Sequence, residues 1–373
     1  METIPLVDLQ AQQADIFDDI RDEIEDVLRS AAFIGGPAVG RFEQEYADFT
    51  GTGHCIGTGN GTDALELALR ACGVKGGDEV ILPANTFVAT AEAVARIGAV
   101  PVLVDVDPEH LLIDPDRVAN AVTPRTRAIV PVHLFGQLAP MERILEIADL
   151  CGAVVVEDAA QSQGARRNGQ VSGSFGRAAA TSFYPGKNLG AAGDAGAVTT
   201  SDPDIAAQVR MLGGHGSSSK YVHDVVGMNS RLDTIQAVVL RAKLRKLTGW
   251  NALRRGAAAR YGLLLVDVPG VTVPASAPGN EDVWHLYVVQ VDNRDAVLDA
   301  LHAEGIGAGI HYPTPVHLTK AFSYLGRGTG DFPVAEAAAG RILSMPIFPH
   351  ITAEQQERVV GTLAQAIRTE ARP

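Results

Sequence analysis

The sequence predicts an α/β protein with a mostly parallel sheet that helices cover on both faces. The first observation is an alternation: between His54 and Asp158, short apolar runs rich in β-branched residues alternate with helix-like segments of about ten residues. The second is size, because 373 residues, 46% of them apolar, suffice for a large domain and a smaller one. We expect a large domain over residues 1–250 and a smaller α/β domain over 251–373.

The expected elements follow in order along the chain. After an extended stretch at 4–9, apolar residues at helical spacing predict amphipathic helices over 11–29 and 38–49. The strands of the main sheet are expected at His54–Thr58, Glu79–Leu82, Val100–Val104, Ala128–Val132, Ala153–Val156, Ala178–Phe183 and Ala195–Thr200. The helices between them are expected at Ala64–Cys72, Thr86–Ile97, Met141–Cys151 and Asp204–Leu212. A long helix is expected from Leu232 to about Leu247, and it continues through Trp250 towards Tyr261 as a second helical stretch. Strands near 283–291 and 306–310 and helices near 294–304, 334–343 and 353–369 follow.

Composition excludes several classes of function. The net charge of −13 and the lack of a Lys/Arg cluster argue against a nucleic-acid-binding protein. No apolar run approaches the ~18 residues of a membrane span, and the acidic N-terminus lacks a signal core. The three cysteines are widely spaced, so we expect no disulfide and a cytoplasmic location. The histidines lack the spacing of a metal site, and we expect no metal.

The segment from Thr181 to Thr200 is the centre of the functional hypothesis. It holds one lysine, Lys187, on a tight loop that proline and glycines define between two apolar strands. Poor solvation lowers the pKa of a lysine and leaves a neutral amine able to attack a carbonyl. Taken alone, the loop favours a surface lysine whose side chain reaches water. Four further features favour the reactive amine.

Polar groups follow the other strands at the edge where ligands bind in parallel sheets. The turn Gly59–Asp63 precedes a helix, so its backbone amides and the Thr62 hydroxyl can hold an anion, although glycine turns of this kind are common. Asp158 ends a buried strand, where an aspartate either caps a helix or pairs with a cation such as a protonated ring nitrogen. Phe87 fits a core residue or a stacking face, and Ser182 can reach a phosphate. Pyridoxal 5′-phosphate requires such a set of groups.

Eight segments of the chain resemble nucleotide-sugar aminotransferases of the DegT/DnrJ/StrS family, which have the pyridoxal-phosphate-dependent transferase fold of type I. They are GNGTDAL, PANTFVATAEAV, PVHLFGQ, VEDAAQSQGA, SFYPGKNLGAAGDAGAV, GMNSRLDTIQAVVL, GIHYPTPVHL and LSMPIFPH. They occur in order from about residue 59 to 350, and the lysine segment is the most specific. The resemblance implies a large domain with a seven-stranded sheet, a smaller C-terminal domain and a homodimer with shared active sites.

The resemblance also implies a role for each matching residue. Lys187 forms the Schiff base with pyridoxal phosphate and moves the proton, and Asp158 pairs with the pyridine nitrogen. The remaining cofactor contacts are Gln161 at the ring hydroxyl, Phe87 stacked on the ring, Thr62, the amide of Asp63 and Ser182 at the phosphate, and Asn229 at the phosphate of the neighbouring subunit's cofactor. The residues that resemble the sugar-nucleotide pocket are Tyr184, Lys220, Tyr221, His223, His311 and His317.

The implied reaction is ping-pong transamination from L-glutamate to a nucleotide-linked keto-sugar, through the pyridoxamine phosphate form. Asp194 and the YPGKN sequence resemble members that act on 3-keto-6-deoxy sugars, such as the dTDP-linked ones, more than members that act on 4-keto sugars. Lys187 argues against the dehydratase branch, in which histidine replaces it. A 4-keto-sugar aminotransferase, another pyridoxal-phosphate enzyme on this fold and a non-catalytic regulator that binds sugar or cofactor remain the alternatives.

Overall fold

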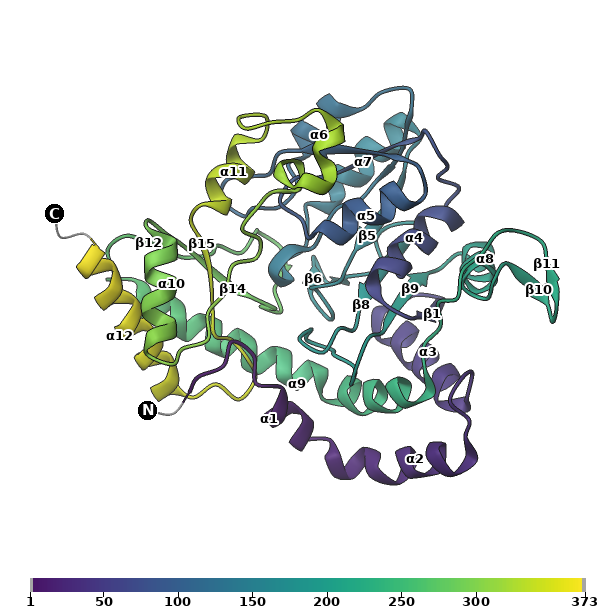
Figure 1. Ribbon diagram of the computed structural model, residues 1–373, viewed down its shortest axis with the longest axis horizontal. Coiled ribbons are helices and arrows are strands. Elements are labelled where there is room, and N and C mark those ends of the chain that lie inside the picture. Colours follow the sequence, from purple (N-terminus) through teal and green to yellow (C-terminus); the bar gives the residue numbers. More distant parts are fainter. Residues whose placement is uncertain (1–2, 371–373) are drawn as a thin grey trace.

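A seven-stranded sheet forms the centre of the large lobe in the computed structural model, which describes residues 3–370 (Figure 1). The strand order is β1-β9-β8-β5-β4-β2-β3. All neighbours pair in parallel except β9, which is antiparallel to β1 and β8. The strands are β1 (His54–Thr58), β2 (Glu79–Pro83), β3 (Val100–Val104), β4 (Thr126–Ile129), β5 (Val154–Asp158), β8 (Ala178–Ser182) and β9 (Gly196–Thr200). The prediction of a mostly parallel sheet is therefore confirmed.

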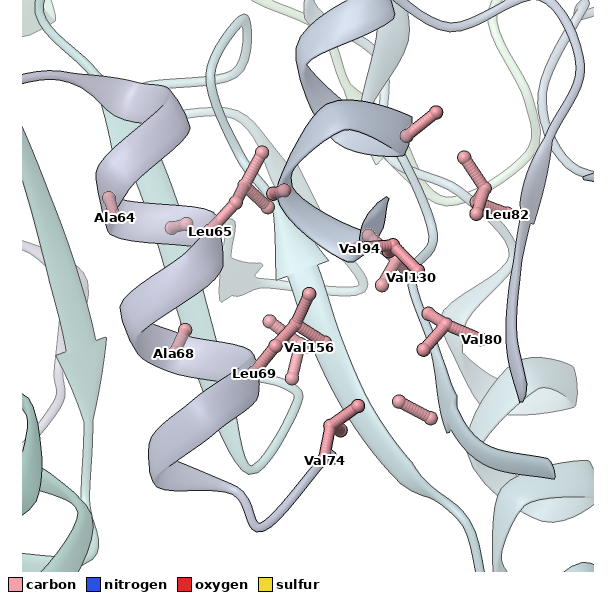
Figure 2. Packing of buried hydrophobic residues seen from close by; sticks show 14 of the residues in the cluster. Ala64, Leu65, Ala68, Leu69, Val74, Val80, Leu82, Val94, Val130 and Val156 are labelled. Carbon is pink, nitrogen blue, oxygen red and sulfur yellow. The ribbon is translucent and has the colours of Figure 1, made fainter. Parts of the chain in front are cut away.

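Helices cover both faces of this sheet. Helices α4 (Gly61–Ala71), α5 (Val88–Arg96) and α8 (Pro203–Gly213) pack on one face, and α6 (Pro115–Ala121) and α7 (Met141–Cys151) on the other. Figure 2 shows Leu69 of α4 beside Val156 of β5 and Val94 of α5 beside Val130, and Leu65 belongs to the same hydrophobic cluster. Removal of these side chains from water supplies the main free energy that holds α4 on the sheet. The N-terminus of α4 is thereby fixed at the carboxyl edge of the strands.

A second helical layer packs below the sheet in Figure 1. Its helices are α1 (Leu9–Ala14), α2 (Phe17–Ser30), α3 (Pro37–Thr50) and α9 (Thr234–Leu265). The expected single helix over 11–29 is wrong, because the chain breaks at Asp15. The Asp15 carboxylate accepts hydrogen bonds from the Trp250 indole (3.1 Å) and the His350 ring (2.8 Å), and Ile16 is buried in the core. Tertiary contacts thus override the helical periodicity of the segment.

The smaller lobe lies at the end of α9 (Figure 1). Its antiparallel sheet has the order β12-β14-β15, and α10 and α12 pack against each other beside it. Its elements are β12 (Val271–Thr272), β14 (Tyr287–Val291), α10 (Arg294–Ala303), β15 (Ile342–Met345) and α12 (Ala353–Glu370). Helix α11 (Pro333–Ala339) lies in the same part of the sequence but packs on the large lobe, where Ala335 and Ala338 join the hydrophobic cluster of α4 and α5 (Figure 1). Helix α9 runs unbroken through the expected boundary at residue 250. We still propose two domains, joined by α9, because residues after Tyr261 contribute to a separate hydrophobic cluster.

Two expected elements of the smaller lobe differ from the structure. Residues 306–310 form only single bridges, Ile306 to Ile4 and Gly309 to Ser344, so the expected strand is wrong. The expected helix at 334–343 ends at Ala339, and its last residues belong to β15, which pairs with β14. The remaining elements are β6 (Arg166–Arg167), β7 (Gln170–Val171), β10 (Ser217–Ser219), β11 (Val222–His223), β13 (Asn280–Glu281), η1 (Leu134–Gly136), η2 (Val316–Leu318) and η3 (Lys320–Leu325).

No helix within residues 3–370 combines the length and the apolar character that a membrane span requires. In the same part of the chain, no group of histidine, cysteine and acidic side chains could hold a metal ion. Cys55, Cys72 and Cys151 are all free thiols.

Candidate active site

A cavity of about 490 Å³ opens at the carboxyl edge of the large sheet. Lys187, on the loop between β8 and β9, lines it together with Asp158 at the end of β5. Thr62 at the start of α4 and Phe87 just before α5 line the same cavity. These four side chains come from segments that follow four different strands, and they line one cavity because the carboxyl ends of parallel strands lie at the same edge of the sheet.

The Lys187 loop is closed by backbone hydrogen bonds. The Lys187 amide donates to the Tyr184 carbonyl (2.8 Å), and the Ala191 amide donates to the Phe183 carbonyl (2.7 Å). Burial lowers the pKa of the Lys187 amine to about 8, while the negative charge of Asp158 acts in the opposite direction. More of this amine is thus uncharged near neutral pH than of an ordinary lysine, and the uncharged form is the one that acts as a nucleophile.

This pKa predicts how the cofactor-free protein reacts with an amine-specific acylating reagent. The rate at Lys187 should rise with pH and reach half its maximum near pH 8, below the ordinary lysine value of ~10.4. Peptide mapping by mass spectrometry at a series of pH values measures this rate. A midpoint at the ordinary lysine value would contradict the burial of the Lys187 amine.

Asp158 is almost fully buried, and other residues fix its carboxylate. The Thr90 hydroxyl donates to Oδ2 (2.7 Å), and the Ala160 amide donates to Oδ1 (3.2 Å). Burial raises the pKa of Asp158, whereas the Thr90 and Ala160 hydrogen bonds and the charges of Lys187 and His133 lower it. The carboxylate is therefore ready to pair with a cationic group that enters the cavity.

Glu157 anchors the end of β5 from the opposite side of the strand. This carboxylate has no exposed surface, and it accepts hydrogen bonds from the amides of Gly173, Phe175 and Gly176 at 2.7–2.9 Å. The fourth hydrogen bond to Glu157 comes from Nε2 of the His133 ring (2.9 Å). This nitrogen must be the donor, because the ring's Nδ1 accepts from the Ala139 amide. This role could not be predicted from a local pattern, because the partners of Glu157 are three backbone amides and a histidine ring at least 16 residues away along the chain.

The N-terminus of α4 provides the anion-binding element. Asn60 caps the helix, and its side chain accepts from the Asp63 amide (2.8 Å), so that amide is already occupied. Among residues 3–370, no acceptor is found for the amides of Gly61 and Thr62. A Cβ on Gly61 would lie 2.6 Å from that of Ser182, so the helix start and Ser182 adjoin. Gly61, Thr62 and Ser182 are thus placed where they could hold an anion, and we refer to them as the anion cradle; the Asp63 amide is not free to donate.

Gln161 and Phe87 also reach the cavity. The Gln161 side chain accepts from the Phe135 amide (2.7 Å) and donates to the Tyr312 hydroxyl (3.0 Å). Phe87 is half-exposed into the cavity, and its ring centre lies 5.1 Å from that of Tyr312. Burial raises the pKa of Tyr312, so its phenol stays protonated at neutral pH. The sequence analysis missed Tyr312 and Thr90, because neither lies directly after a strand.

Two of the six expected sugar-pocket residues line the cavity that contains Lys187, and the other four do not. Tyr184 and His311 line the cavity, and the His311 ring lies 2.8 Å from the Ser344 hydroxyl. Burial, followed by the charge of Lys187, lowers the pKa of His311 to about 4. His317 lies outside the cavity: it is buried against Phe332 and its ring lies 3.0 Å from Glu336.

The other expected contacts lie away from this chain's own cavity. Lys220, Tyr221 and His223 belong to the exposed β10–β11 hairpin, which projects at the right of Figure 1. Asn229 is exposed and bridges to Gly214 near the base of this hairpin. The described chain therefore does not bring these four residues to its own Lys187.

The cavity fits pyridoxal 5′-phosphate. The free amides of Gly61 and Thr62 and the Ser182 hydroxyl can donate to its phosphate, and the Asp158 carboxylate can pair with its ring nitrogen. The Phe87 ring can stack on the face of the cofactor ring, and the Lys187 amine can react with the aldehyde. Bound there, the cofactor would supply an electron sink and a carrier for an amino group.

Comparison with known proteins decides the family. Residues 14–364 match the DegT/DnrJ/EryC1/StrS aminotransferase family. The chain belongs to this family.

Individual members of the family are similar to this chain over nearly its whole length. The erythromycin biosynthesis sensory transduction protein EryC1 of Saccharopolyspora erythraea is 49% identical, over 96% of this chain and 98% of the relative. The dTDP-3-amino-3,4,6-trideoxy-α-D-glucose transaminase of Streptomyces venezuelae is 44% identical, over 97% of this chain and 96% of the relative. The crystal structure of S. venezuelae DesV in complex with a ketimine intermediate superposes with a TM-score of 0.95, at 44% identity and 98% coverage of both chains. The predicted fold, family and pyridoxal-phosphate-dependent sugar aminotransferase activity are therefore confirmed.

The hydrogen bond from Thr90 to Asp158 leads to a prediction for this aminotransferase. Thr90→Val removes the donor, raises the pKa of Asp158 further and should lower kcat by about tenfold, with a smaller change in KM. Steady-state kinetics of the variant measure the effect, and Thr90→Ser, which keeps the hydroxyl, is the matched control. A Thr90→Val enzyme with the kcat of the Ser variant would show that this hydrogen bond is dispensable.

Proposed function

We propose that the chain transfers the amino group of L-glutamate to C3 of a dTDP-linked 3-keto-6-deoxyhexose. Lys187 moves the proton in both half-reactions, and Asp158 keeps the cofactor ring nitrogen protonated. The observation that carries the proposal is the convergence of the Lys187 amine, the buried Asp158 carboxylate and the anion cradle in one cavity. The 3-position and the dTDP group are supported by the relative from S. venezuelae, whose name specifies a dTDP-linked 3-amino sugar.

The structure supports a direct role for Tyr184 and His311 in sugar binding. Tyr184 is 59% exposed and His311 half-buried, and both line the cavity that contains Lys187. With its lowered pKa, His311 is a neutral ring at physiological pH and can donate or accept a single hydrogen bond to a sugar hydroxyl. No corresponding role for His317 in the cavity is proposed, because its ring is buried beside Glu336.

The remaining contacts lead us to propose a homodimer. Lys220, Tyr221, His223 and Asn229 are exposed, and a symmetric partner can take them into its own cavity. In this arrangement Asn229 contacts the cofactor phosphate of the partner, and Lys220 approaches the phosphates of the partner's sugar nucleotide. A cytoplasmic location is also proposed, and it rests on the three free cysteines.

A mixing experiment tests the shared site. Lys187→Ala and Asn229→Ala homodimers should each have little activity, but subunit exchange should restore about a quarter of the wild-type rate. The reason is that half of the dimers are mixed, and each mixed dimer has one site with an intact Lys187 and an intact Asn229 from the partner. No restoration, after native mass spectrometry has shown that subunits exchanged, would place Asn229 in its own chain's site.

The substrate itself is tested by single turnover. The enzyme is first converted by L-glutamate to its amino-loaded form and then mixed with matched keto-sugar nucleotides: dTDP-3-keto, dTDP-4-keto and UDP-linked 3-keto sugars. We expect the dTDP-3-keto sugar to be aminated at least about tenfold faster than the others, which corresponds to one well-placed hydrogen bond. A faster reaction with the 4-keto sugar would establish the alternative of a 4-keto-sugar aminotransferase.

The name of EryC1, a sensory transduction protein, is the reason to test a regulatory alternative as well. A regulator would bind the cofactor and a sugar nucleotide without forming 2-oxoglutarate from glutamate. One equivalent of 2-oxoglutarate per subunit, measured in the first half-reaction, excludes this alternative.

A further inference from the structure

The turn between β1 and α4 leads into the anion cradle, and one of its hydrogen bonds comes from a distant part of the chain. The Gly59 amide donates to the side-chain oxygen of Ser230 (3.0 Å), which is 171 residues away in sequence. Ser230 lies in the segment between the β10–β11 hairpin and α9, and it is 4% exposed. A buried hydroxyl thus holds the residue that directly precedes Asn60, the cap of α4.

The other polar groups of this turn bond to one another. The Thr58 hydroxyl donates to the Asn60 carbonyl (3.0 Å), and the Asn60 side chain accepts from the Asp63 amide (2.8 Å). Gly59 has no side chain that would restrict its backbone angles or form a contact of its own. Its amide needs a partner where it is shielded from water, and Ser230 supplies that partner.

Ser230 is fixed in turn by the end of α8. Its amide donates to the Gly213 carbonyl (2.9 Å), and a Cβ on Gly213 would lie 2.8 Å from the Ser230 carbonyl oxygen. The Met228 amide makes the same kind of bond to the Leu212 carbonyl (2.8 Å). Helix α8 also packs on β1, the strand that precedes Gly59. Ser230 therefore reaches the turn from a part of the chain that the same strand holds in place.

Buried and exposed side chains alternate along the segment 229–234. The exposed ones are Asn229, Arg231 and Asp233, and the buried ones are Ser230, Leu232 and Thr234. Such alternation is expected of an extended chain, in which successive side chains point in opposite directions. Ser230 consequently contacts its own chain's turn, whereas Asn229 is directed outward, where the proposed partner subunit would take it up.

We propose that Ser230 is a positioning residue for phosphate binding: its hydroxyl holds Gly59 and thereby keeps the amides of Gly61 and Thr62 directed at the cofactor phosphate. Without this acceptor, the Gly59 amide loses its partner, and the turn must rearrange to satisfy it. The amides at the start of α4 then lose part of the alignment with which a helix N-terminus binds an anion. The inference goes beyond the proposed function, because it concerns neither the sugar nor the amino donor.

Two ligands that differ only in the phosphate, pyridoxal 5′-phosphate and pyridoxal, test this role. Both have the aldehyde for Lys187, but only the first has a group for the anion cradle. Ser230→Ala should weaken binding of pyridoxal 5′-phosphate to the cofactor-free, full-length protein by about tenfold and change that of pyridoxal by less than about twofold. Absorbance titrations measure both affinities. Equal losses for the two ligands, or an unchanged affinity for pyridoxal 5′-phosphate, would overturn the proposal.

Ser201→Ala is the matched control. The Ser201 hydroxyl accepts from the Gly53 amide (3.3 Å) just before β1, so it makes the same kind of bond at the opposite end of that strand. Its removal should leave both affinities unchanged, and an effect equal to that of Ser230→Ala would overturn the specific role of Ser230. Thermal unfolding shows whether each variant folds.

Hydrogen exchange of the wild-type protein adds a test that needs no variant. In cofactor-free protein labelled with ¹⁵N-glycine, the Gly59 amide should be protected from exchange without any ligand. The Gly61 amide should become protected only after inorganic phosphate is added. A Gly59 amide that exchanges as fast as that of Gly61 before phosphate is added would overturn the proposal. No sugar substrate enters either test, so a failure here is distinct from a failure of the proposed function.

Discussion

Replacing Lys187 with alanine is expected to lower the rate of amino transfer by at least about a thousandfold, because the variant has no amine to bind the cofactor covalently or to move the substrate proton. The fold should survive, since the Lys187 backbone hydrogen bonds to Tyr184 do not involve the side chain. The cofactor should still bind at the anion cradle, but without the absorbance of a lysine-linked form.

Lys246→Ala is the control for this experiment. Lys246 is an exposed lysine on α9, and its removal should leave both the rate and the absorbance unchanged. A Lys187→Ala protein that keeps a tenth or more of the wild-type rate would contradict the assignment. Such a result would direct attention to another buried lysine, and Lys243 of α9, whose pKa burial lowers to about 8, would be examined first.

Replacing Asp158 with asparagine should lower kcat by about 10²–10³-fold, as expected when one preorganised electrostatic contact is removed from a buried site. The asparagine has nearly the same shape, and its oxygen can still accept from Thr90. The loss therefore reports the charge of the carboxylate rather than its packing. Steady-state kinetics and the absorbance spectrum of bound cofactor measure it.

Asp149→Asn, at an exposed position on α7, is the matched control for the loss of one negative charge. Equal kcat values for Asp158→Asn and Asp149→Asn would mean that the carboxylate at the end of β5 does not act on the cofactor ring. Because burial raises the pKa of Asp158, the wild-type enzyme should also lose activity on acidification at a higher pH than an exposed aspartate would cause.

Much of the site was predictable because parallel sheets bring the carboxyl ends of their strands together. Lys187, Asp158, Thr62 and Phe87 each lie just beyond a strand that the hydrophobic pattern reveals, and all four line one cavity. The motif-level resemblance added the chemistry to this geometry. Periodicity was less useful where tertiary contacts decide, as at Asp15, where hydrogen bonds to Trp250 and His350 divide one predicted helix into two.

The residues that support the site could not be predicted in this way. Thr90 reaches Asp158 from the first turn of α5, and Tyr312 reaches Gln161 from more than a hundred residues further along the chain. The partner of His285 is Asn188, which adjoins Lys187 but is 97 residues away in sequence from the histidine. The pairings of Tyr312 and His285 depend on how the C-terminal part of the chain packs on the large lobe, and no local pattern encodes that arrangement. His317 shows the reverse error: a motif histidine that is buried beside Glu336.

The most direct test of the central claim is to locate the cofactor on the chain. The purified enzyme, loaded with pyridoxal 5′-phosphate, is reduced with borohydride, digested and analysed by mass spectrometry. We expect one phosphopyridoxyl group per subunit, on the peptide that contains Lys187, and none after prior treatment with L-glutamate. A modified lysine elsewhere in the chain, or no modified peptide from a fully loaded enzyme, would contradict it.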